Sequence, residues 1–159
     1  MAIEVEVRDS LPMDVDMLFE NIAPPDWREI ALMTLGDPRE LFQKTLSVGH
    51  GPQWTGFIDG ELACMFGVTG RTVFSSIGQP WLVGTRKLRK HPVTFMRYTR
   101  PYFEIMKSMF SVLRNWVHVE NRAAVRWLKW LGFRFREPVA IRPRGAMFCP
   151  FEWRADSCV

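Results

Sequence analysis

Apolar and polar residues alternate along several short segments of the chain, which is the pattern of β-strands with one buried face. The first strand is expected over residues 3–8, where Ile and Val alternate with Glu and Arg. The clearest pair of strands, 53–58 and 61–68, flanks Asp59-Gly60, a dipeptide typical of the type I′ turn. These segments predict a sheet with at least one tight hairpin.

Apolar residues recur every three to four positions in other segments, which is the spacing of amphipathic helices. Asp26 and Asp37 are suited to cap two of these helices, because a carboxylate can accept hydrogen bonds from a first helical turn. Pro24-Pro25 is expected to end the helix before it. Pro101 falls inside the longest pattern and predicts a kink or two abutting helices. The expected helices are 13–22, 27–35, 38–48, 92–113 and 122–131.

Shorter apolar runs complete the order of elements. Strands are expected at 80–83 and 116–119, and residues 73–77 are either a short strand or irregular. Residues 138–141 and 147–153 are expected to form a closing hairpin. The order is a strand, two or three helices, a hairpin, a strand, the long helix, a strand, a helix and two strands. It predicts an α+β fold with a mixed sheet.

The segment from Asn115 to Phe135 combines a strand, a helix and a second strand in one short run. Asn121 is suited to be the N-cap, because its side-chain oxygen can accept a hydrogen bond from the first helical turn. Gly132 supplies the left-handed residue that ends the helix, and Phe133 begins the next strand. The sequence of this segment is NWVHVENRAAVRWLKWLGFRF.

This segment resembles the last conserved segment of the GNAT superfamily of N-acetyltransferases, whose consensus runs Asn, two residues, Ala, an aromatic residue and then Gly-Phe. The order of elements over nearly the whole chain is also that of the GNAT fold. The resemblance implies a central, mixed, twisted sheet of about six or seven strands with helices on both faces. It also implies one GNAT-like domain over residues 1–159.

A narrower resemblance covers the run WLVGTRKLRKHPVTFMRYTRPYFEIM, which leads to RAAVRWLKWLGF. This run is similar to GNAT-like proteins of tailed bacteriophages and prophages, including internal-virion or morphogenesis proteins of short-tailed phages. The resemblance implies partners among phage virion or assembly proteins, with self-association as an alternative. It implies a location in the host cytoplasm during assembly, or in the virion.

The resemblance also directs attention to the basic turn before the long helix. GNAT enzymes bind the pyrophosphate of acetyl-CoA with a glycine-containing turn, whose N–H groups approach the phosphates. Here the turn 86–92 has no glycine, and Pro92 has no N–H. Three interpretations of the turn therefore stay open. It is a solvated basic loop, a binding site for an anion or an acidic partner, or a site for the pyrophosphate of CoA. The candidate cofactor-binding residues are Arg86, Lys87, Arg89, Lys90 and Asn121.

An acetyltransferase of this fold also needs a general acid and a base. Many GNAT enzymes place a tyrosine on the last helix as the acid, and that position is Leu128 here. Tyr98, Tyr102 or Cys64 would have to take its place. The candidate catalytic bases are His118, on the strand before the last helix, and Glu61, beside the hairpin turn. Whether the protein is an enzyme stays open at this point.

The last helix carries two indoles that share a face, Trp127 and Trp130, because they are three residues apart. They either form part of a core stripe or are exposed against a partner. Arg126 directly precedes Trp127 in the sequence and suits an acidic partner surface. Trp127, Trp130 and Arg126 are therefore the candidate partner-binding residues.

Composition narrows the classes of function. The formal charge of +4 permits an anionic ligand, but nucleic acid binding is not expected, because no stacking pattern accompanies the lysines and arginines. Three widely spaced cysteines and three scattered histidines predict reduced thiols and no metal site. We expect no secretion signal and no membrane-spanning segment.

Two functions follow from these observations. The first is a phage-encoded GNAT-fold protein that is catalytically degenerate and acts through protein contacts in virion assembly or as a minor virion component. It needs no cofactor. The alternative is an acetyl-CoA-dependent N-acetyltransferase that transfers acetyl to an amine. The missing glycine turn and the missing tyrosine favour the first.

Overall fold

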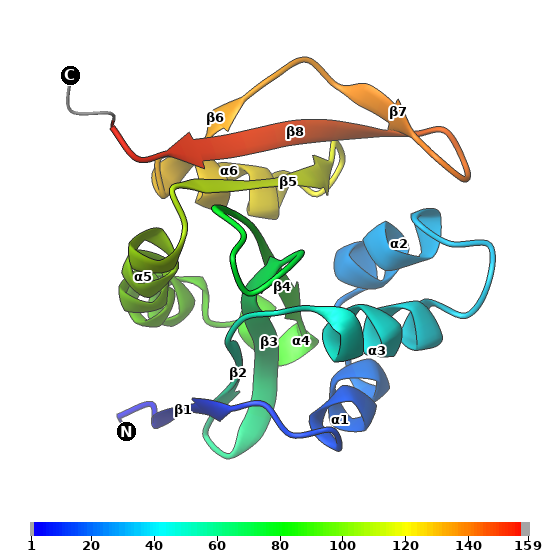
Figure 1. Cartoon of the computed structure of the whole chain (residues 1–159). Coiled ribbons are helices and arrows are strands. Elements are labelled where there is room, and N and C mark those ends of the chain that lie inside the picture. The colour runs from blue at the N-terminus through cyan, green and yellow to red at the C-terminus, as the bar shows by residue number, and fades with distance from the viewer. Residues whose placement is uncertain (1, 157–159) are drawn as a thin grey trace.

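The computed structural model describes residues 2–156, which form one mixed sheet of eight strands with helices on both faces (Figure 1). The strand order is β1-β2-β3-β4-β5-β8-β6, and β7 pairs with β8. The strands are β1 (Val5–Asp9), β2 (Gln53–Ile58), β3 (Glu61–Gly70), β4 (Ile77–Gly84), β5 (Val112–His118), β6 (Arg134–Phe135), β7 (Val139–Ile141) and β8 (Ala146–Arg154). The helices are α1 (Asp14–Glu20), α2 (Pro24–Leu32), α3 (Pro38–Val48), α4 (Arg86–Arg89), α5 (Pro92–Met109) and α6 (Arg122–Trp130).

The predicted α+β class with a central mixed sheet is confirmed, with eight strands where about six or seven were expected. The turn at Asp59-Gly60 has the expected positive φ angles of 50° and 78°. Asp37 caps α3, since its Oδ1 accepts a hydrogen bond of 2.9 Å from the N–H of Arg39. Gly132 follows α6 with a φ of 95°, as a left-handed helix stop requires.

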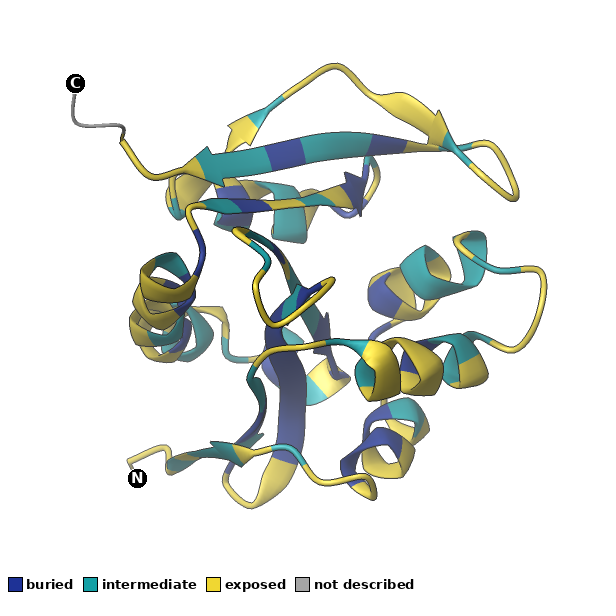
Figure 2. Ribbon diagram, in the orientation of Figure 1, coloured by how far each residue is buried: buried dark blue, intermediate teal, exposed yellow. Residues whose placement is uncertain are grey.

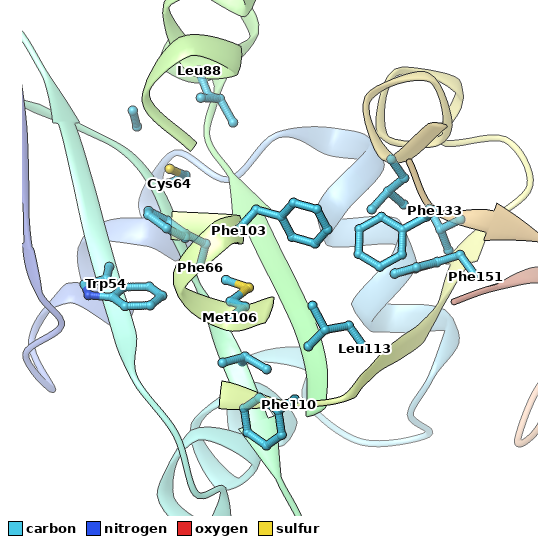
Figure 3. Close-up of a cluster of buried hydrophobic side chains, with 14 of the residues drawn as sticks. Trp54, Cys64, Phe66, Leu88, Phe103, Met106, Phe110, Leu113, Phe133 and Phe151 are labelled. Carbon is cyan, nitrogen blue, oxygen red and sulfur yellow. The ribbon is translucent and has the colours of Figure 1, made fainter. Parts of the chain in front are cut away.

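The sheet separates two hydrophobic clusters, one under each layer of helices. The central strand β3 is buried along most of its length (Figure 2). The larger cluster lies between the sheet and helices α4, α5 and α6, and Phe103, Leu113 and Phe151 are among its members (Figure 3). The smaller one joins α1 and α3 to the opposite face through Leu18, Phe42 and other side chains. The two layers therefore hold the central strands from both sides.

The central strands β4 and β5 are parallel neighbours, but they pair only where Ile77 meets Val112 and Gly78 meets Leu113. Beyond this point the strands are no longer paired. The side chain of Asn115 spans part of the separation and donates from Nδ2 to the carbonyl of Pro80 at 2.9 Å. The carboxyl ends of β4 and β5 therefore diverge, which is where α/β sheets commonly bind ligands.

Several predicted boundaries are wrong. Pro24-Pro25 opens α2 instead of ending the helix before it, because proline is tolerated in a first helical turn. Asp26 consequently lies inside α2, and Ala23 holds the N-cap position. The long helix ends at Met109, so Leu113 belongs to β5. Helix α5 runs through Pro101 as one helix, so two abutting helices are excluded.

Candidate functional site

A cluster of polar side chains lies where β4 and β5 diverge. Asp26 and Glu29 come from α2, Arg89 ends α4, and Asn121 precedes α6. Asn121 donates from Nδ2 to Asp26 Oδ1 at 3.2 Å and to Glu29 Oε2 at 2.9 Å. Arg89 Nη2 donates to Asp26 Oδ1 at 2.9 Å. Four side chains from three distant parts of the sequence thus form one hydrogen-bonded network, which we call the carboxylate network.

Asp26 is the centre of the carboxylate network and is only 7% exposed. Its Oδ2 accepts a hydrogen bond of 2.7 Å from the N–H of Gly84, the last residue of β4. The carbonyl of Gly84 accepts from the N–H of Ala23 at 2.9 Å. Burial raises the pKa of Asp26, although Arg89 and the hydrogen bonds from Gly84 and Asn121 act against this. The chain leading into α2 therefore covers the end of β4.

Glu29 lies one turn further along α2 and has a strongly shifted pKa. Burial raises the pKa of Glu29 to about 7, and the negative charge of Asp26 adds to this effect. The hydrogen bond from Asn121 and the charge of Arg89 act in the opposite direction. Glu29 is thus a carboxyl group that gains or loses its proton near neutral pH.

Asn121 occupies the N-cap position of α6, but the predicted side-chain cap hydrogen bond is not formed. Its amide nitrogen is used by the two carboxylates of α2, and its Oδ1 accepts from Arg89 Nη2 at 3.4 Å. The charged groups around Asn121 make stronger hydrogen bonds than a neutral backbone N–H can offer. The cap prediction failed because these groups come from elsewhere in the sequence.

The basic turn 86–92 is mostly the short helix α4 and not an open loop. Its N–H groups make local bonds: Arg86 donates to the carbonyl of Asn21 at 3.1 Å, and His91 donates to that of Leu88 at 3.0 Å. Arg89 and Lys90 likewise donate to Thr85 and Lys87 at 3.4 and 3.2 Å. Few backbone N–H groups of this turn remain for an anion.

The four basic side chains of the turn have different surroundings. Arg89 is bound to Asp26, and Lys87 forms an ion pair of 3.3 Å with Glu61. Arg86 is exposed and lines a surface groove between α1 and α2 together with Phe19 and Trp27, among other residues. Lys90 is exposed as well. The structure brings Arg89 and Asn121 together but directs Lys87 toward the β2–β3 hairpin.

The two candidate bases lie in different environments. His118 ends β5 and is buried, with its ring 5.2 Å from that of Phe148. Burial and the charge of Arg28 lower the pKa of His118, while Glu120 raises it. Glu61 is exposed at the start of β3 and is engaged by Lys87. His118 is the candidate nearer the carboxylate network, since its backbone N–H lies beside the carboxyl group of Glu29 and acts to lower the pKa of that group.

None of the candidate general acids lies in the carboxylate network. Leu128 is 5% exposed and packs in the larger cluster. Tyr102 packs with its ring 4.9 Å from Trp54, and Tyr98 is exposed on α5. Cys64 is buried, and burial raises the pKa of its thiol to about 12. These side chains serve packing or lie away from the diverging strands.

The candidate partner residues divide between core and surface. Trp127 is half-buried and packs on Phe95 with ring centroids 5.0 Å apart. Trp130 is 43% exposed, and the guanidinium of Arg100 lies 4.8 Å from its ring centroid. Arg126 is exposed on the same helix. We call Trp130, Arg126 and Arg100 the α6 surface.

Sequence reasoning missed the two carboxylates of α2 as site residues. Asp26 was assigned to a helix cap, and Glu29 was not singled out. One signal was present: the two residues are three apart and so share a helix face beside a proline pair. Their partners, Gly84, Arg89 and Asn121, could not be inferred from that spacing.

Two negative findings hold for residues 2–156. No helix in this range is long and apolar enough to cross a membrane. No group of three His, Cys, Asp or Glu side chains in the same range is arranged to hold a metal ion.

Solved structures define the class of this fold. A GNAT-family acetyltransferase of Streptococcus pneumoniae is similar to 96% of the chain over its full length, with a TM-score of 0.62 and 17% identity. An N-acetyltransferase of Staphylococcus aureus Mu50 gives a TM-score of 0.66 with 11% identity, covering 95% of this chain and 98% of its own. The aminoglycoside acetyltransferase AAC(6')-Ib in complex with coenzyme A gives 0.63 with 14% identity, covering 95% of both chains. The chain has the GNAT fold.

A second comparison finds a phage protein family whose model matches part of the chain. Residues 67–139 match the model of the family described as "Bacteriophage T7, probable scaffold protein Gp13". This range contains the basic turn, α5 and α6, and thus the runs that carry the narrower resemblance. No curated protein matches the chain. The resemblance to GNAT-like phage proteins is confirmed by the two kinds of comparison together.

Proposed function

We propose that this protein is a catalytically degenerate GNAT-fold protein that acts through protein contacts in phage assembly or as a minor virion component. The observation that carries the proposal is the position of Asp26. Its carboxylate binds both the N–H of Gly84 and the guanidinium of Arg89 at the diverging ends of the central strands. The match to a phage scaffold family supports the assembly role.

The charges at this opening are unfavourable for a polyanionic cofactor. Asp26 and Glu29 place two carboxyl groups beside Asn121, and Asp26 forms an ion pair of 2.9 Å with Arg89. Phosphates would have to compete with Asp26 for Arg89 and would be repelled by the carboxylates. We infer that the residues present do not fit acetyl-CoA.

The backbone of the basic turn leads to the same inference. An anion site at a helix start needs N–H groups that point outward and have no other partner. Arg86, Arg89 and His91 use their N–H groups within the fold, and Pro92 at the start of α5 has none. The backbone of this turn therefore favours a solvated basic loop and argues against a site for the pyrophosphate of CoA.

Protein contacts are supported by the α6 surface. Exposed tryptophan and arginine side chains are common anchors of protein interfaces. Arg100 stacks on Trp130 and holds the indole in one orientation, which reduces the entropy lost on binding. Arg126 adds a positive charge that favours an acidic partner. Self-association through this surface is the alternative to a different virion protein.

Titration with coenzyme A by calorimetry and thermal shift tests the cofactor inference. We expect no heat of binding and no rise in the melting temperature, because a ligand that binds only the folded state must raise it. Micromolar binding that Arg89→Ala and Asn121→Ala weaken, while Arg71→Ala in an exposed loop does not, would overturn the cofactor inference and favour the acetyl-CoA-dependent N-acetyltransferase instead.

The assembly role is tested with Trp130→Ala in phage that carry the altered gene. We expect an unchanged melting temperature and a reduced amount of the protein among virion parts. Trp27→Ala removes an equally exposed indole from α2 and serves as the control. Normal incorporation of the Trp130 variant would exclude the α6 surface from the interface.

A further inference from the structure

Half of the sheet has one face without a helix layer. In β5, Val117 points into the larger cluster with Leu128 and Phe133, on the side of α6. Trp116 precedes Val117 and therefore points to the opposite face, because successive strand residues alternate. Trp116 is 39% exposed, whereas the part of this face formed by β3 and β4 is covered by α1 and α3.

Strand pairing identifies the other residues of this face. Trp116 lies opposite Pro150, and Arg114 lies opposite Glu152. On the other side of β8, Arg134 lies opposite Glu152. Arg136 comes two residues after Arg134 and therefore lies on the same face. Its N–H donates to the carbonyl of Pro150 at 3.0 Å. We call Trp116, Arg114, Pro150, Arg134 and Arg136 the open sheet face.

One end of the open sheet face is closed. His118 and Phe148 continue the same rows, and both are buried. Arg144, in the turn between β7 and β8, donates from Nε to the carbonyls of Ala31 and Thr34 at 3.3 and 3.1 Å. These bonds tie that turn to the end of α2. The exposed rows are therefore bounded by α2 on one side.

The charge of the open sheet face is positive. Arg114, Arg134 and Arg136 are exposed, and none of them forms an ion pair within residues 2–156. The acid between the rows, Glu152, is held by Arg154 in two hydrogen bonds of 2.6 and 3.2 Å. Three arginines without an acidic partner thus surround one exposed indole.

We propose that the open sheet face docks an acidic protein segment that carries an apolar side chain. Its carboxylates bind Arg114, Arg134 and Arg136, for which the bidentate arginine–carboxylate geometry is well suited. Its apolar side chain packs on the indole of Trp116 beside Pro150. The proposal stands apart from the α6 surface, since α6 covers the opposite face of these strands.

A protein segment fits this face better than single-stranded nucleic acid or a second copy of the chain. Single-stranded nucleic acid binds to rows of aromatic side chains, and this face offers one exposed indole. A second copy meeting face to face would oppose arginine with arginine.

The test uses the full chain and a short synthetic peptide of alternating glutamate and leucine as the probe. The indole N–H signal of Trp116 is followed by NMR and identified through its loss in Trp116→Phe. We expect a saturable shift of this signal that weakens as salt rises to about 0.15 M. Arg114→Glu with Arg134→Glu is expected to weaken the binding about ten-fold or more.

Three outcomes would overturn the proposal. The first is no shift of the Trp116 signal, or an equal loss in the control Arg71→Glu with Arg142→Glu, which makes the same charge change at two exposed positions. The second is tighter binding of a single-stranded oligonucleotide than of the peptide. The third is self-association that Arg114→Glu abolishes. The result does not depend on whether coenzyme A binds, so this proposal and the proposed function can fail separately.

Discussion

The amide nitrogen of Asn121 lies 3.2 Å from Oδ1 of Asp26, although the two residues are 95 positions apart in the chain. The bond connects the start of α6 to the first turn of α2. It joins the last conserved segment of the GNAT pattern to the helix that covers the end of β4. An asparagine that the sequence presents as a helix cap therefore belongs to a tertiary network.

Removing the carboxylate of Asp26 is expected to destabilise the fold. Asp26→Ala leaves Arg89 and the N–H of Gly84 without their partner. Removing one partner of such a buried pair lowers the free energy of unfolding by about 2–4 kcal/mol. Urea unfolding measures the loss. The control is Asp16→Ala, which removes the exposed ion pair with Arg39 and is expected to cost less than about 1 kcal/mol. Equal losses would mean that the carboxylate network contributes no more than a surface pair.

The stability of the protein is expected to depend on pH through Glu29. The pKa of Glu29 is about 7 in the folded protein and ordinarily 4.5, so the folded state holds this proton more tightly than the unfolded chain. This contribution is fully present below pH 4.5 and is lost as the pH rises through about 7. Glu29→Gln keeps the shape without the titration. We expect the stability of this variant relative to the wild type to rise by about 1–3 kcal/mol between about pH 5 and pH 8.

The comparison with the Gln variant is necessary because His118 changes stability in the opposite direction. Burial lowers the pKa of His118, so its contribution is present above its ordinary pKa and is lost as the pH falls. Subtracting the unfolding free energy of the wild type from that of the Gln variant cancels the contribution of His118, because both proteins contain it. Thermal unfolding across the pH range gives the difference, with Glu20→Gln on the exposed end of α1 as the control. A difference that is constant with pH would show that Glu29 is ionised throughout.

Asp14 is expected to govern stability at acid pH. Burial alone would raise the pKa of Asp14, but hydrogen bonds from Arg8, the N–H of Leu11 and the hydroxyl of Thr55 together lower it. The stability that Asp14 provides is therefore present above pH 3.8 and is lost as the pH falls below that value. Asp14→Asn should lose about 2–4 kcal/mol at neutral pH and much less at about pH 2. Equal losses at both pH values would contradict an ionised Asp14.

Restoring the tyrosine of GNAT enzymes at Leu128 is expected to damage the core. Leu128 is 5% exposed in the larger cluster, so a bulkier ring forces neighbouring side chains apart at a cost of about 1–3 kcal/mol. Leu128→Met conserves the volume and serves as the control, with an expected cost below about 1.5 kcal/mol. Denaturant unfolding measures both. A tyrosine variant as stable as the methionine variant would reveal space that the packing does not show.

Much of the fold could be predicted because its signals are local. The Asp59-Gly60 turn, the Asp37 cap and the stop at Gly132 depend on backbone angles or on bonds between near neighbours, and all three were found from the sequence. The errors also have a local cause. Pro24-Pro25 can end one helix or open the next, and the residues themselves do not decide between these roles.

The sequence by itself determined the α+β order, the hairpins and the absence of glycine from the basic turn, since each depends on residue type and spacing along the chain. Only the tertiary structure decided what lies between the diverging strands. Asp26, Arg89 and Asn121 meet because α2 packs over the ends of β4 and β5, and a hydrogen bond between residues 95 apart leaves no periodicity in the sequence. The same holds for the open sheet face, whose residues come from β5, β8 and the end of β6 and are brought into adjacent rows by strand pairing alone.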